Sequence, residues 1–336
     1  MNLAIFKTNH LGDNVVFLPV VQTLRRLRPT WRITLLTAPH VAELYQAAIA
    51  PENLLTVDPE HLKRAWRRPW ELLGWTQRLR TRRFDACLVS YDQSSVAHAL
   101  ARITGGRTRV GAAGLRIRLR GTLTHEIARA ADWSVAKWNW ETARALVAHI
   151  DGAADWPAEP PPPDLAHLAP ATVRQPRRIV VHAGSKSPMT RWPRAQFAAL
   201  ATRLARDHEV RWIDAPEIPG PLPAGTQACP SRTLGELVQV VAGASLLIGN
   251  NSGPMHIATA VGTPGVIISG PSARVWDPTW HAEKFQLLRT PGLACLPCDR
   301  ALRAAPTCQN TVEPFACMHR WSVEAVEAAC RRALAT

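Results

Sequence analysis

A polar turn at residues 249–254 (GNNSGP) combines residue types that bind anions. It follows an apolar strand-like segment, 244–248, and opens a helix-like segment, 255–261. Unpaired N–H groups and the helix dipole favour a negative group such as a diphosphate at a helix start. We expect Ser252 to cap this helix through its hydroxyl. The residues expected to bind ligand here are Asn251, Ser252, Gly253, Pro254 and His256. The alternative is a β-turn-α-β connection that binds nothing.

A second loop suited to chemistry is KTNHLGD, residues 7–13, which links a predicted strand to a predicted helix. Asp13 could act as a general base that takes a proton from an attacking hydroxyl, or it could cap the helix. Lys7 ends the strand and could pair with Asp13 or with a phosphate. Gly12 allows a close turn, and His10 lies in the same loop.

The third loop, residues 181–193, carries hydroxyl and cationic groups in front of a predicted helix. Its candidate ligands for the phosphates of a nucleotide leaving group are Ser185, Lys186, Thr190 and Arg191. An ordinary solvated basic loop has the same composition. The sequence has neither a G-x-x-x-x-G-K-[ST] nor a G-x-G-x-x-G pattern, which argues against a P-loop NTPase and against a dinucleotide dehydrogenase.

Cys295, Cys298, Cys308 and Cys317 follow the spacing C-x2-C-x9-C-x8-C near the end of the chain. Four thiols with a leading C-x-x-C pair can form a tetrahedral site for a structural zinc or iron. Four free cysteines, or a disulfide in an oxidising compartment, are the alternatives. A metal here would stabilise the segment 295–317 and would take no part in catalysis.

Strand and helix patterns alternate along both halves of the chain, which is typical of parallel α/β sheets. The segment 156–163 (WPAEPPPP) predicts a stiff linker. The sequence therefore predicts a first domain over 1–155 and a second over 164–336, with a ligand cleft where the carboxyl ends of their sheets face each other. Predicted helices include 14–27, 41–48, 70–80, 94–103 and 194–207.

The chain has 336 residues, a formal net charge of +14 and 13 tryptophans, several of them beside arginine, as in residues 64–70. This composition suits an anionic membrane face or an acidic acceptor, and the alternative is an ordinary solvated surface. Nucleic-acid binding is disfavoured because the sequence has no helix-turn-helix, zinc-finger or RRM signature. No apolar run is long enough to span a bilayer and no signal peptide is evident, so we expect a cytoplasmic protein, peripheral at the inner membrane.

The three loops, in this order along the chain, resemble glycosyltransferase family 9, the ADP-heptose:lipopolysaccharide heptosyltransferases, over essentially the whole sequence. The resemblance implies an α/β GT-B architecture of two facing Rossmann-like domains with parallel sheets. It also implies an inverting, metal-independent transfer of a heptose from ADP-heptose to the lipopolysaccharide inner core. By the same resemblance Asp13 is the general base, and Lys186 or Arg191 offsets the charge of the departing diphosphate. The turn at 251–253, with His256, holds diphosphate and sugar.

Two departures from the family pattern affect the expected site. Thr190 stands where the family often has lysine, so Lys186 could replace that lysine from four residues upstream. Asn251 stands where a carboxylate is more frequent, which bears on the identity of the donated sugar. Further candidates are Arg102, Arg107 and Arg109 for an acidic acceptor, and Asp214 and Glu217 for the nucleotide or sugar.

Two other functions remain open from the sequence. One is a protein O-heptosyltransferase acting on autotransporter serines, because the cysteine cluster is similar to the iron-bound cysteine finger of such enzymes. The other is a nucleotide-sugar-binding protein without transferase activity, suggested by the departures at Thr190 and Asn251. The retained Asp13 argues against the second.

Overall fold

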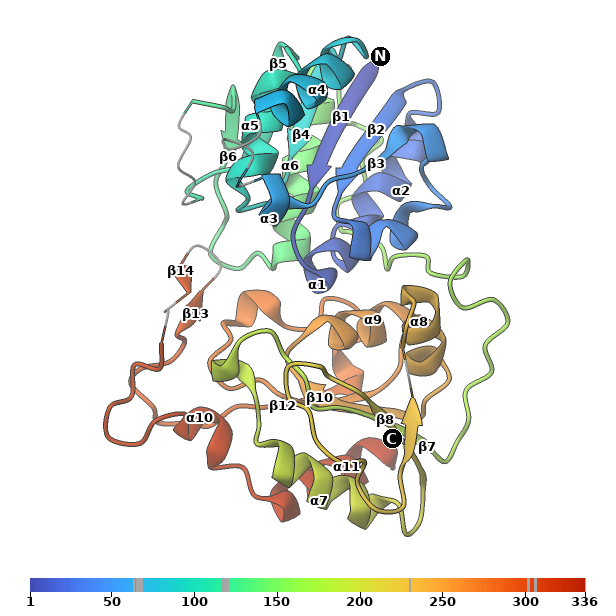
Figure 1. Ribbon diagram of the computed structural model, residues 1–336, viewed down its shortest axis with the longest axis vertical. Helices are drawn as coiled ribbons and strands as arrows, with labels where there is room; N and C mark the ends of the chain where they lie inside the picture. The colour runs from blue at the N-terminus through green and yellow to red at the C-terminus, as the bar shows by residue number, and fades with distance from the viewer. Residues whose placement is uncertain are drawn as a thin grey trace. The chain divides into compact units, whose positions relative to one another are not determined.

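The computed structural model describes residues 1–62, 64, 69–115, 121–229, 231–300, 303–304 and 307–335. The chain forms two compact units, Met1–Pro163 and Asp164–Thr336. Each unit is a parallel sheet with helices on both faces (Figure 1), so the expected α/β fold is confirmed. In the described residues no helix has the length and apolar composition needed to cross a bilayer.

The first unit is built on a parallel sheet with the strand order β3-β2-β1-β4-β5-β6. Its strands are β1 (Asn2–Lys7), β2 (Arg32–Thr37), β3 (Leu54–Thr56), β4 (Ala86–Val89), β5 (Thr108–Ala112) and β6 (His125–Ile127). Its helices are α1 (Leu11–Val15), α2 (Leu18–Leu27), α3 (Pro59–Leu62), α4 (Pro69–Arg80), α5 (Ser95–Ile103) and α6 (Val135–Ile150), with the 3-10 turns η1 (Pro39–Tyr45) and η2 (Pro51–Asn53).

The second unit repeats this strand order, as β12-β11-β10-β7-β8-β9. Its strands are β7 (Arg178–His182), β8 (Glu209–Ile213), β9 (Gln227–Cys229), β10 (Leu246–Asn250), β11 (Gly265–Ile268) and β12 (Phe285–Leu288). Its helices are α7 (Arg194–Leu204), α8 (Leu234–Ala242), α9 (Gly253–Val261), α10 (Ala316–His319) and α11 (Val323–Leu334), with the 3-10 turns η4 (Pro188–Thr190), η5 (Arg274–Trp276) and η6 (Ala282–Lys284). A separate hairpin joins β13 (Asp299–Arg300) to β14 (Arg303–Ala304).

The central strands are buried on both faces, which explains their continuous apolar sequence. In the first unit, Ala4 and Phe6 of β1 pack against Leu100 of α5. In the second, Ile248 of β10 belongs to one core cluster with Phe197 of α7. Because the strands are held on both sides, the loops at their carboxyl ends start from fixed positions.

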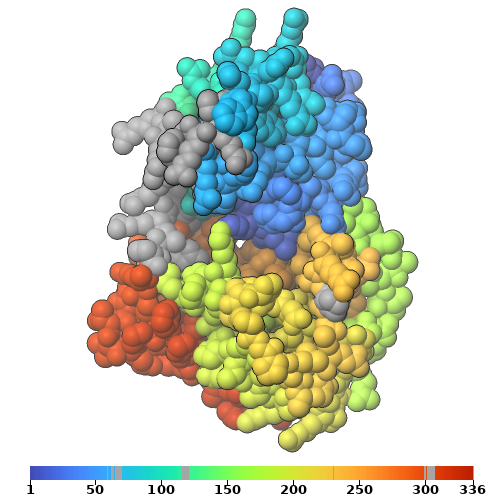
Figure 2. Space-filling view, viewed as in Figure 1, coloured from blue at the N-terminus to red at the C-terminus, as the bar shows by residue number. Residues whose placement is uncertain are grey.

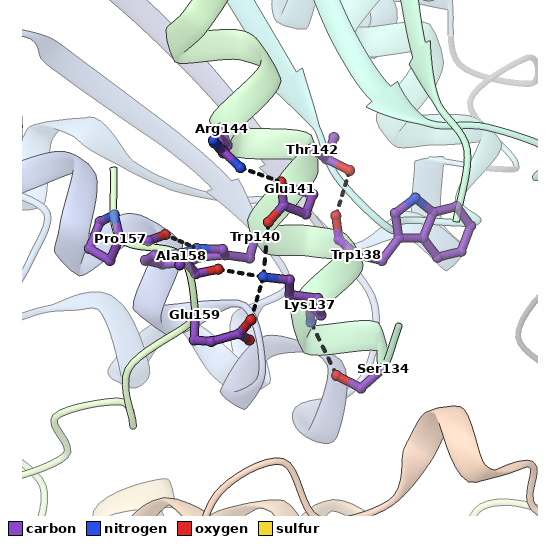
Figure 3. A network of polar contacts seen from close by, with 10 residues as sticks. All are labelled: Ser134, Lys137, Trp138, Trp140, Glu141, Thr142, Arg144, Pro157, Ala158 and Glu159. Carbon is purple, nitrogen blue, oxygen red and sulfur yellow. Dashed lines mark hydrogen bonds and ion pairs between the residues drawn. The ribbon is translucent and has the colours of Figure 1, made fainter. Parts of the chain in front are cut away.

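The proline-rich segment is attached to the first unit rather than suspended in solvent. Lys137 of α6 makes ion pairs with Glu159 at 2.8 Å and with Glu141 at 3.0 Å, and it donates to the carbonyl of Ala158 (Figure 3). Trp140 Nε1 donates to the carbonyl of Pro157 at 2.8 Å (Figure 3). The predicted linker at 156–163 is therefore fixed along its first half.

Several local expectations were wrong. The helix predicted over 14–27 is interrupted, because α1 ends at Val15 and α2 begins at Leu18 with Pro19 in its first turn. The helix predicted over 41–48 is instead the 3-10 turn η1, which starts at Pro39. Trp66, Arg67 and Arg68 of the predicted basic, aromatic run lie outside the described residues.

Two glycines provide a matched test of packing in the first unit. A Cβ at Gly111 of β5 would lie 2.5 Å from the carbonyl oxygen of Val89, whereas one at Gly74 of α4 would meet no atom within 4 Å. We expect Gly111→Ala to lower the free energy of unfolding by about 1–3 kcal/mol through overpacking. Gly74→Ala should raise it by up to about 1 kcal/mol through helix propensity. Urea-unfolding midpoints measure both, and equal midpoints would contradict the packing of β5 against β4.

Candidate functional site

The sequence-predicted loops leave strands at the centre of each sheet, where the strand order reverses. In the first unit β1 lies between β2 and β4, and in the second β10 lies between β11 and β7. Ligands of open α/β sheets bind outside the carboxyl ends of the strands at such reversal points. The predicted loop 7–13 comprises the last residue of β1, the connection 8–10 and the first turn of α1, and the loops 183–192 and 251–252 follow β7 and β10.

The loop after β1 is shaped by a buried amide that the sequence analysis did not single out. Asn14 is fully buried, and its Nδ2 donates to the carbonyls of Asn9 and His10, both at 2.9 Å. Its Oδ1 accepts from the Tyr45 hydroxyl at 2.7 Å. These bonds fix the start of α1, where Asp13 is partly exposed in the first turn. The position before α1 is occupied by His10, so Asp13 is not the N-cap residue.

Lys7 does not occupy the position expected of a phosphate ligand. Its side chain is fully buried at the end of β1, and Nζ donates to the carbonyl of Tyr91. Burial lowers the pKa of Lys7, and the charges of Asp13 and Asp92 oppose that shift. The expectation that Lys7 binds phosphate directly is corrected, because its ammonium is enclosed between β1 and the loop after β4. Asp92, which the sequence analysis did not consider, is part of this charge cluster.

In the second unit, the side chain of Asn250 ties two predicted loops together. Asn250 is 1% exposed at the end of β10. Its Nδ2 donates to the carbonyls of Ala183 at 2.7 Å and Gly184 at 3.3 Å, and its Oδ1 accepts from the Trp192 N–H at 2.9 Å. The loop after β7 is therefore held at both ends by a residue of the 249–254 turn. The sequence pattern predicted its neighbour Asn251 as a ligand and gave no signal that distinguishes Asn250.

The loop after β7 is closed by its own polar groups. The hydroxyls of Ser185 and Thr190 lie 2.5 Å apart, and Thr190 Oγ1 also donates to the carbonyl of Ser187 at 2.9 Å. Arg191 donates from Nε to the carbonyl of Ser185 at 2.6 Å and from Nη2 to that of Lys186 at 3.1 Å. The guanidinium of Arg191 is thus oriented by the loop, while Lys186 is exposed.

The turn after β10 differs in one respect from the expectation. The Ser252 side chain does not cap α9; its Oγ donates instead to the carbonyl of Asn250 at 3.3 Å. Asn251 Nδ2 donates to Ser269 Oγ at 3.1 Å, and Ser269 Oγ accepts from Arg289 at 3.0 Å. Because the hydroxyl is turned away, the N-terminal backbone groups of α9, which begins with Gly253 and Pro254, are not covered by a side-chain cap.

Two histidines flank this turn, His256 buried and His182 half-buried. His256, in the first turns of α9, and His182, at the end of β7, have pKa values lowered to about 4 by burial, with Glu217 weakly opposing the shift at His182. The Nδ1 atoms of both are buried, and neither has a hydrogen-bond partner in the described part of the chain. At neutral pH both rings are uncharged, so His256 can offer a ligand a hydrogen bond but no positive charge.

The remaining candidates are dispersed. Arg102 and Arg107 are exposed, whereas Arg109 uses its guanidinium to donate to the carbonyls of Thr122 and Gly106, both at 2.6 Å. Arg109 is therefore committed to the fold of the first unit, which weakens its assignment to an acceptor. Asp214 lines an open cavity of about 290 Å³ beyond β8, together with Arg194, Trp212 and Gly220.

The four clustered cysteines converge, although their chain spacing is wide. Cys295, Cys298, Cys308 and Cys317 line one small cavity next to Phe315. Cys308 Sγ accepts from the Phe315 N–H at 3.2 Å. The pKa of Cys317 is raised to about 11 by burial and then by the other three thiols. In the described residues no group of three or more His, Cys, Asp or Glu side chains is arranged to hold a metal ion.

The sequence of the chain matches a known protein family. The family model described as glycosyltransferase family 9 (heptosyltransferase) matches residues 73–306, well over half of the chain. Lipooligosaccharide heptosyltransferase 2 of Campylobacter jejuni (serotype O:6) is 29% identical over 120 residues. That match spans 32% of this chain and 38% of the relative, well short of the relative's full length.

Solved structures extend the likeness of fold to the whole chain. Escherichia coli heptosyltransferase WaaC with ADP-2-deoxy-2-fluoro heptose has a TM-score of 0.69 at 17% identity, over 99% of both chains. The iron-containing dodecameric glycosyltransferase TibC of enterotoxigenic E. coli has a TM-score of 0.58 at 16% identity, over 99% of this chain and 75% of that one. The predicted GT-B class is thereby confirmed. The chain belongs to glycosyltransferase family 9, the heptosyltransferase family.

Proposed function

We propose that the chain is an inverting glycosyltransferase that moves a heptose from ADP-heptose to the lipopolysaccharide inner core. The observation that carries the proposal is the coupling by Asn250 of the loop after β7 to the uncapped start of α9. This arrangement, at the reversal point of a parallel sheet, suits a nucleotide diphosphate. Family membership, the name of the Campylobacter relatives and the ADP-heptose analogue bound to WaaC support the sugar and the acceptor class.

In the proposed reaction, Asp13 takes the proton of the acceptor hydroxyl as its oxygen attacks the anomeric carbon. The bond from that carbon to the diphosphate breaks, and ADP leaves with the bonding electrons. The α9 N-terminus and the cations Lys186 and Arg191 stabilise the charge that develops on the diphosphate. His256, being neutral, contributes a hydrogen bond to phosphate or sugar.

The remaining proposed ligands shape the site around these groups. Asn251 donates from Nδ2 to Ser269, which leaves its carbonyl oxygen to accept from a sugar hydroxyl. Ser185 and Thr190 hold the phosphate loop in shape through their mutual hydrogen bond. His10 and Gly12 lie beside Asp13 at the start of α1, where an acceptor hydroxyl would approach.

The test is turnover of ADP-heptose with a heptose-free lipopolysaccharide core acceptor. We expect Asp13→Asn to lower kcat about 10²- to 10⁴-fold, because a general base contributes that much. ADP-heptose should still raise its melting temperature, since the donor loops belong to the second unit. Asp164→Asn, on the exposed start of that unit, is the control and should keep wild-type turnover. Wild-type kcat in Asp13→Asn would refute the assigned base.

The second candidate function is transfer of the heptose to a protein acceptor. The observation that favours this function is that the four clustered cysteines line one cavity. The fold likeness to the iron-containing TibC is consistent with it. Transfer to an autotransporter protein, seen as a heptose-sized mass increase on serine, with none to the lipopolysaccharide core, would replace the first acceptor. Stabilisation by ADP-heptose without turnover on either acceptor would indicate a nucleotide-sugar-binding protein.

We further propose that an anionic membrane surface binds the first unit through α4. Trp70 and Leu73 are 65% and 69% exposed. At 100° per residue they share one helix face, while Leu79 on the opposite face is buried. Arg78 and Arg80 are exposed on the two flanks of that face. An exposed tryptophan and leucine between arginines suit the interface of a bilayer with anionic lipids. In Figure 2 the cyan atoms of this part of the chain stand at the surface of the first unit.

Vesicle sedimentation tests the membrane proposal. We expect the wild-type chain to bind phosphatidylglycerol-containing vesicles and to bind pure phosphatidylcholine vesicles much more weakly, with salt reducing the difference. The double variant Trp70→Ala/Leu73→Ala should bind at least about 10-fold more weakly, because two exposed apolar side chains no longer enter the interface. The matched control Val173→Ala/Val312→Ala removes exposed apolar side chains of the second unit (72% and 95% exposed). Equal losses in both variants would contradict a role for α4.

The structural metal expected at the cysteines remains a proposal. Four cysteines that line one cavity are a donor set that suits zinc or iron. Because no three of them are arranged to hold an ion in the described residues, metal binding would have to bring the thiols closer together and release their protons. We expect metal analysis of the purified protein to give about one zinc or iron per chain, and Cys298→Ser/Cys308→Ser to lose it. Cys330→Ser, a buried cysteine of the α11 core, is the control. Metal-free wild-type protein in which all seven cysteines titrate as thiols after unfolding would establish free cysteines instead.

A further inference from the structure

We propose that Asp92 is the positioning residue for Asp13: its carboxylate balances the buried ammonium of Lys7 and anchors the loop that leads to Asp13. The proposal deepens the proposed function and rests on it for the role of Asp13. Asp92 lies in the loop between β4 and α5, and β4 is the neighbour of β1 at the reversal point of the first sheet. None of the three sequence loops contains it.

The contacts of Asp92 join the two loops at this point. Its carboxylate is fully buried. Oδ2 accepts from the backbone N–H of Thr8 and, at 3.1 Å, from the Thr8 hydroxyl. Oδ1 accepts from the Ser94 N–H at 2.8 Å, at the start of α5. Charge-assisted hydrogen bonds of this kind are about twice as strong as neutral ones. Asp92 therefore holds the residue that follows Lys7 to the start of α5.

The loop that carries Asp92 is fixed by side chains of α5 and α6. His98 of α5, which is fully buried, has Nε2 3.0 Å from the carbonyl oxygen of Asp92 and Nδ1 3.2 Å from the Thr122 hydroxyl. Asn139 of α6 accepts at Oδ1 from the Tyr91 N–H at 2.9 Å and from the Ser90 hydroxyl at 2.6 Å. The loop after β4 is thus fixed from both faces of the sheet before it meets the loop after β1.

The charge argument concerns how Lys7 is neutralised. Its ammonium lies 5.3 Å from the ring centre of Phe17 and 5.7 Å from that of Tyr91, in a largely apolar enclosure. A buried ammonium without a counter-charge is strongly destabilising. If Asp13 were the sole carboxylate beside Lys7, it would be held as a permanent ion pair with a lowered pKa and reduced basicity. The charges of Asp13 and Asp92 both act on the Lys7 ammonium. Asp92 therefore shares, from the buried side, a charge that the partly exposed Asp13 would otherwise balance alone.

The titratable groups around this cluster come from five segments. They are Lys7 on β1, Asp13 on α1, Asp92 and Tyr91 after β4, His98 on α5, and Tyr45 in η1. Burial lowers the pKa of His98, which favours its neutral form. Burial raises the pKa of Tyr45 well above its usual value, and Asp13 and Asp92 raise it further, so Tyr45 stays neutral. Lys7 and the two carboxylates therefore set the charge near Asp13 at neutral pH.

The experiment measures the pKa of the Asp13 carboxyl by ¹³C NMR, with the signal assigned by its loss in Asp13→Asn, together with the pH profile of kcat. Removing a neighbouring negative charge lowers a carboxyl pKa. In Asp92→Asn we therefore expect the Asp13 pKa, and the acid limb of the kcat profile, to move down by about one pH unit. The plateau of kcat should fall about 10- to 100-fold through misplacement of the base. KM for ADP-heptose should stay within about twofold, since the donor loops belong to the second unit.

Asp85→Asn is the matched control. Asp85 Oδ2 accepts the Asn2 N–H at 2.7 Å, a carboxylate-to-backbone bond at the opposite end of the same strand, and it is exposed. The Asp85→Asn variant should have the wild-type Asp13 pKa and the wild-type kcat. An unmoved Asp13 pKa in Asp92→Asn, or equal losses of kcat in the two variants, would overturn the proposal.

A second variant covers the case in which Asp92→Asn does not fold. Lys7→Met/Asp92→Asn removes both buried charges together, so the double variant should be the more stable one and its Asp13 pKa should return toward the wild-type value. An Asp13 pKa that differs from wild type by one unit or more in the double variant would count against the proposal. The NMR titration needs no turnover, so it judges Asp92 even if the chain proves inactive on ADP-heptose.

Discussion

The arrangement of the second unit's candidate site depends on the buried side chain of Asn250. One amide satisfies two carbonyls of the loop after β7 and one N–H at the entrance to α7. These three backbone groups lie near the end of the sheet, and leaving one unsatisfied in a buried position costs about 1–3 kcal/mol. The orientation of Arg191 and the Ser185–Thr190 pair rests on the same loop. The polar side chains of this loop are therefore placed by a residue that is itself inaccessible.

In the first unit, different side chains satisfy the backbone groups of the loop at the end of the sheet. Asn14 satisfies the carbonyls of the loop after β1, and Asp92 satisfies the N–H and hydroxyl of Thr8 in that loop. In both units the anchor lies at the reversal point of the strand order, where loops from adjacent strands diverge and their backbone groups lack sheet partners. The difference is charge: the second unit uses a neutral amide, whereas the first encloses an ammonium and a carboxylate. Under the proposed function, the second unit binds phosphate and needs hydrogen-bond geometry, whereas the first carries the base and needs a controlled local potential, and this difference in charge fits both roles.

Much of the fold could be predicted from sequence, because buried parallel strands give continuous apolar runs and because glycine and proline mark their ends. The same glycine and proline residues identified the segments that carry Asp13, Arg191 and His256. Asn250 and Asp92 escaped prediction for a physical reason: they bond backbone groups of distant segments, which leave no pattern in the sequence. Asn14 bonds the nearby carbonyls of Asn9 and His10, but its burial against Tyr45 of a distant segment depends on the fold. Asn250 and Asn251 are adjacent and chemically identical, and the burial of the first distinguishes them only in the folded structure. Lys7 was misjudged in the same way, since its enclosure depends on the loop after β4.

The attachment of the proline-rich segment to α6 bears on how the chain folds during synthesis. Lys137, Trp140 and the residues they hold, up to Glu159, all precede the start of the second unit at residue 164. The first sheet and its covering helices are likewise complete by Ile150. The emerging chain can therefore close its first core and fasten the trailing segment before any strand of the second sheet has been made. Pro160–Pro163 adds no backbone N–H donor after that point. The nascent second half then emerges behind a finished domain, with little opportunity to pair its apolar strands with those of the first.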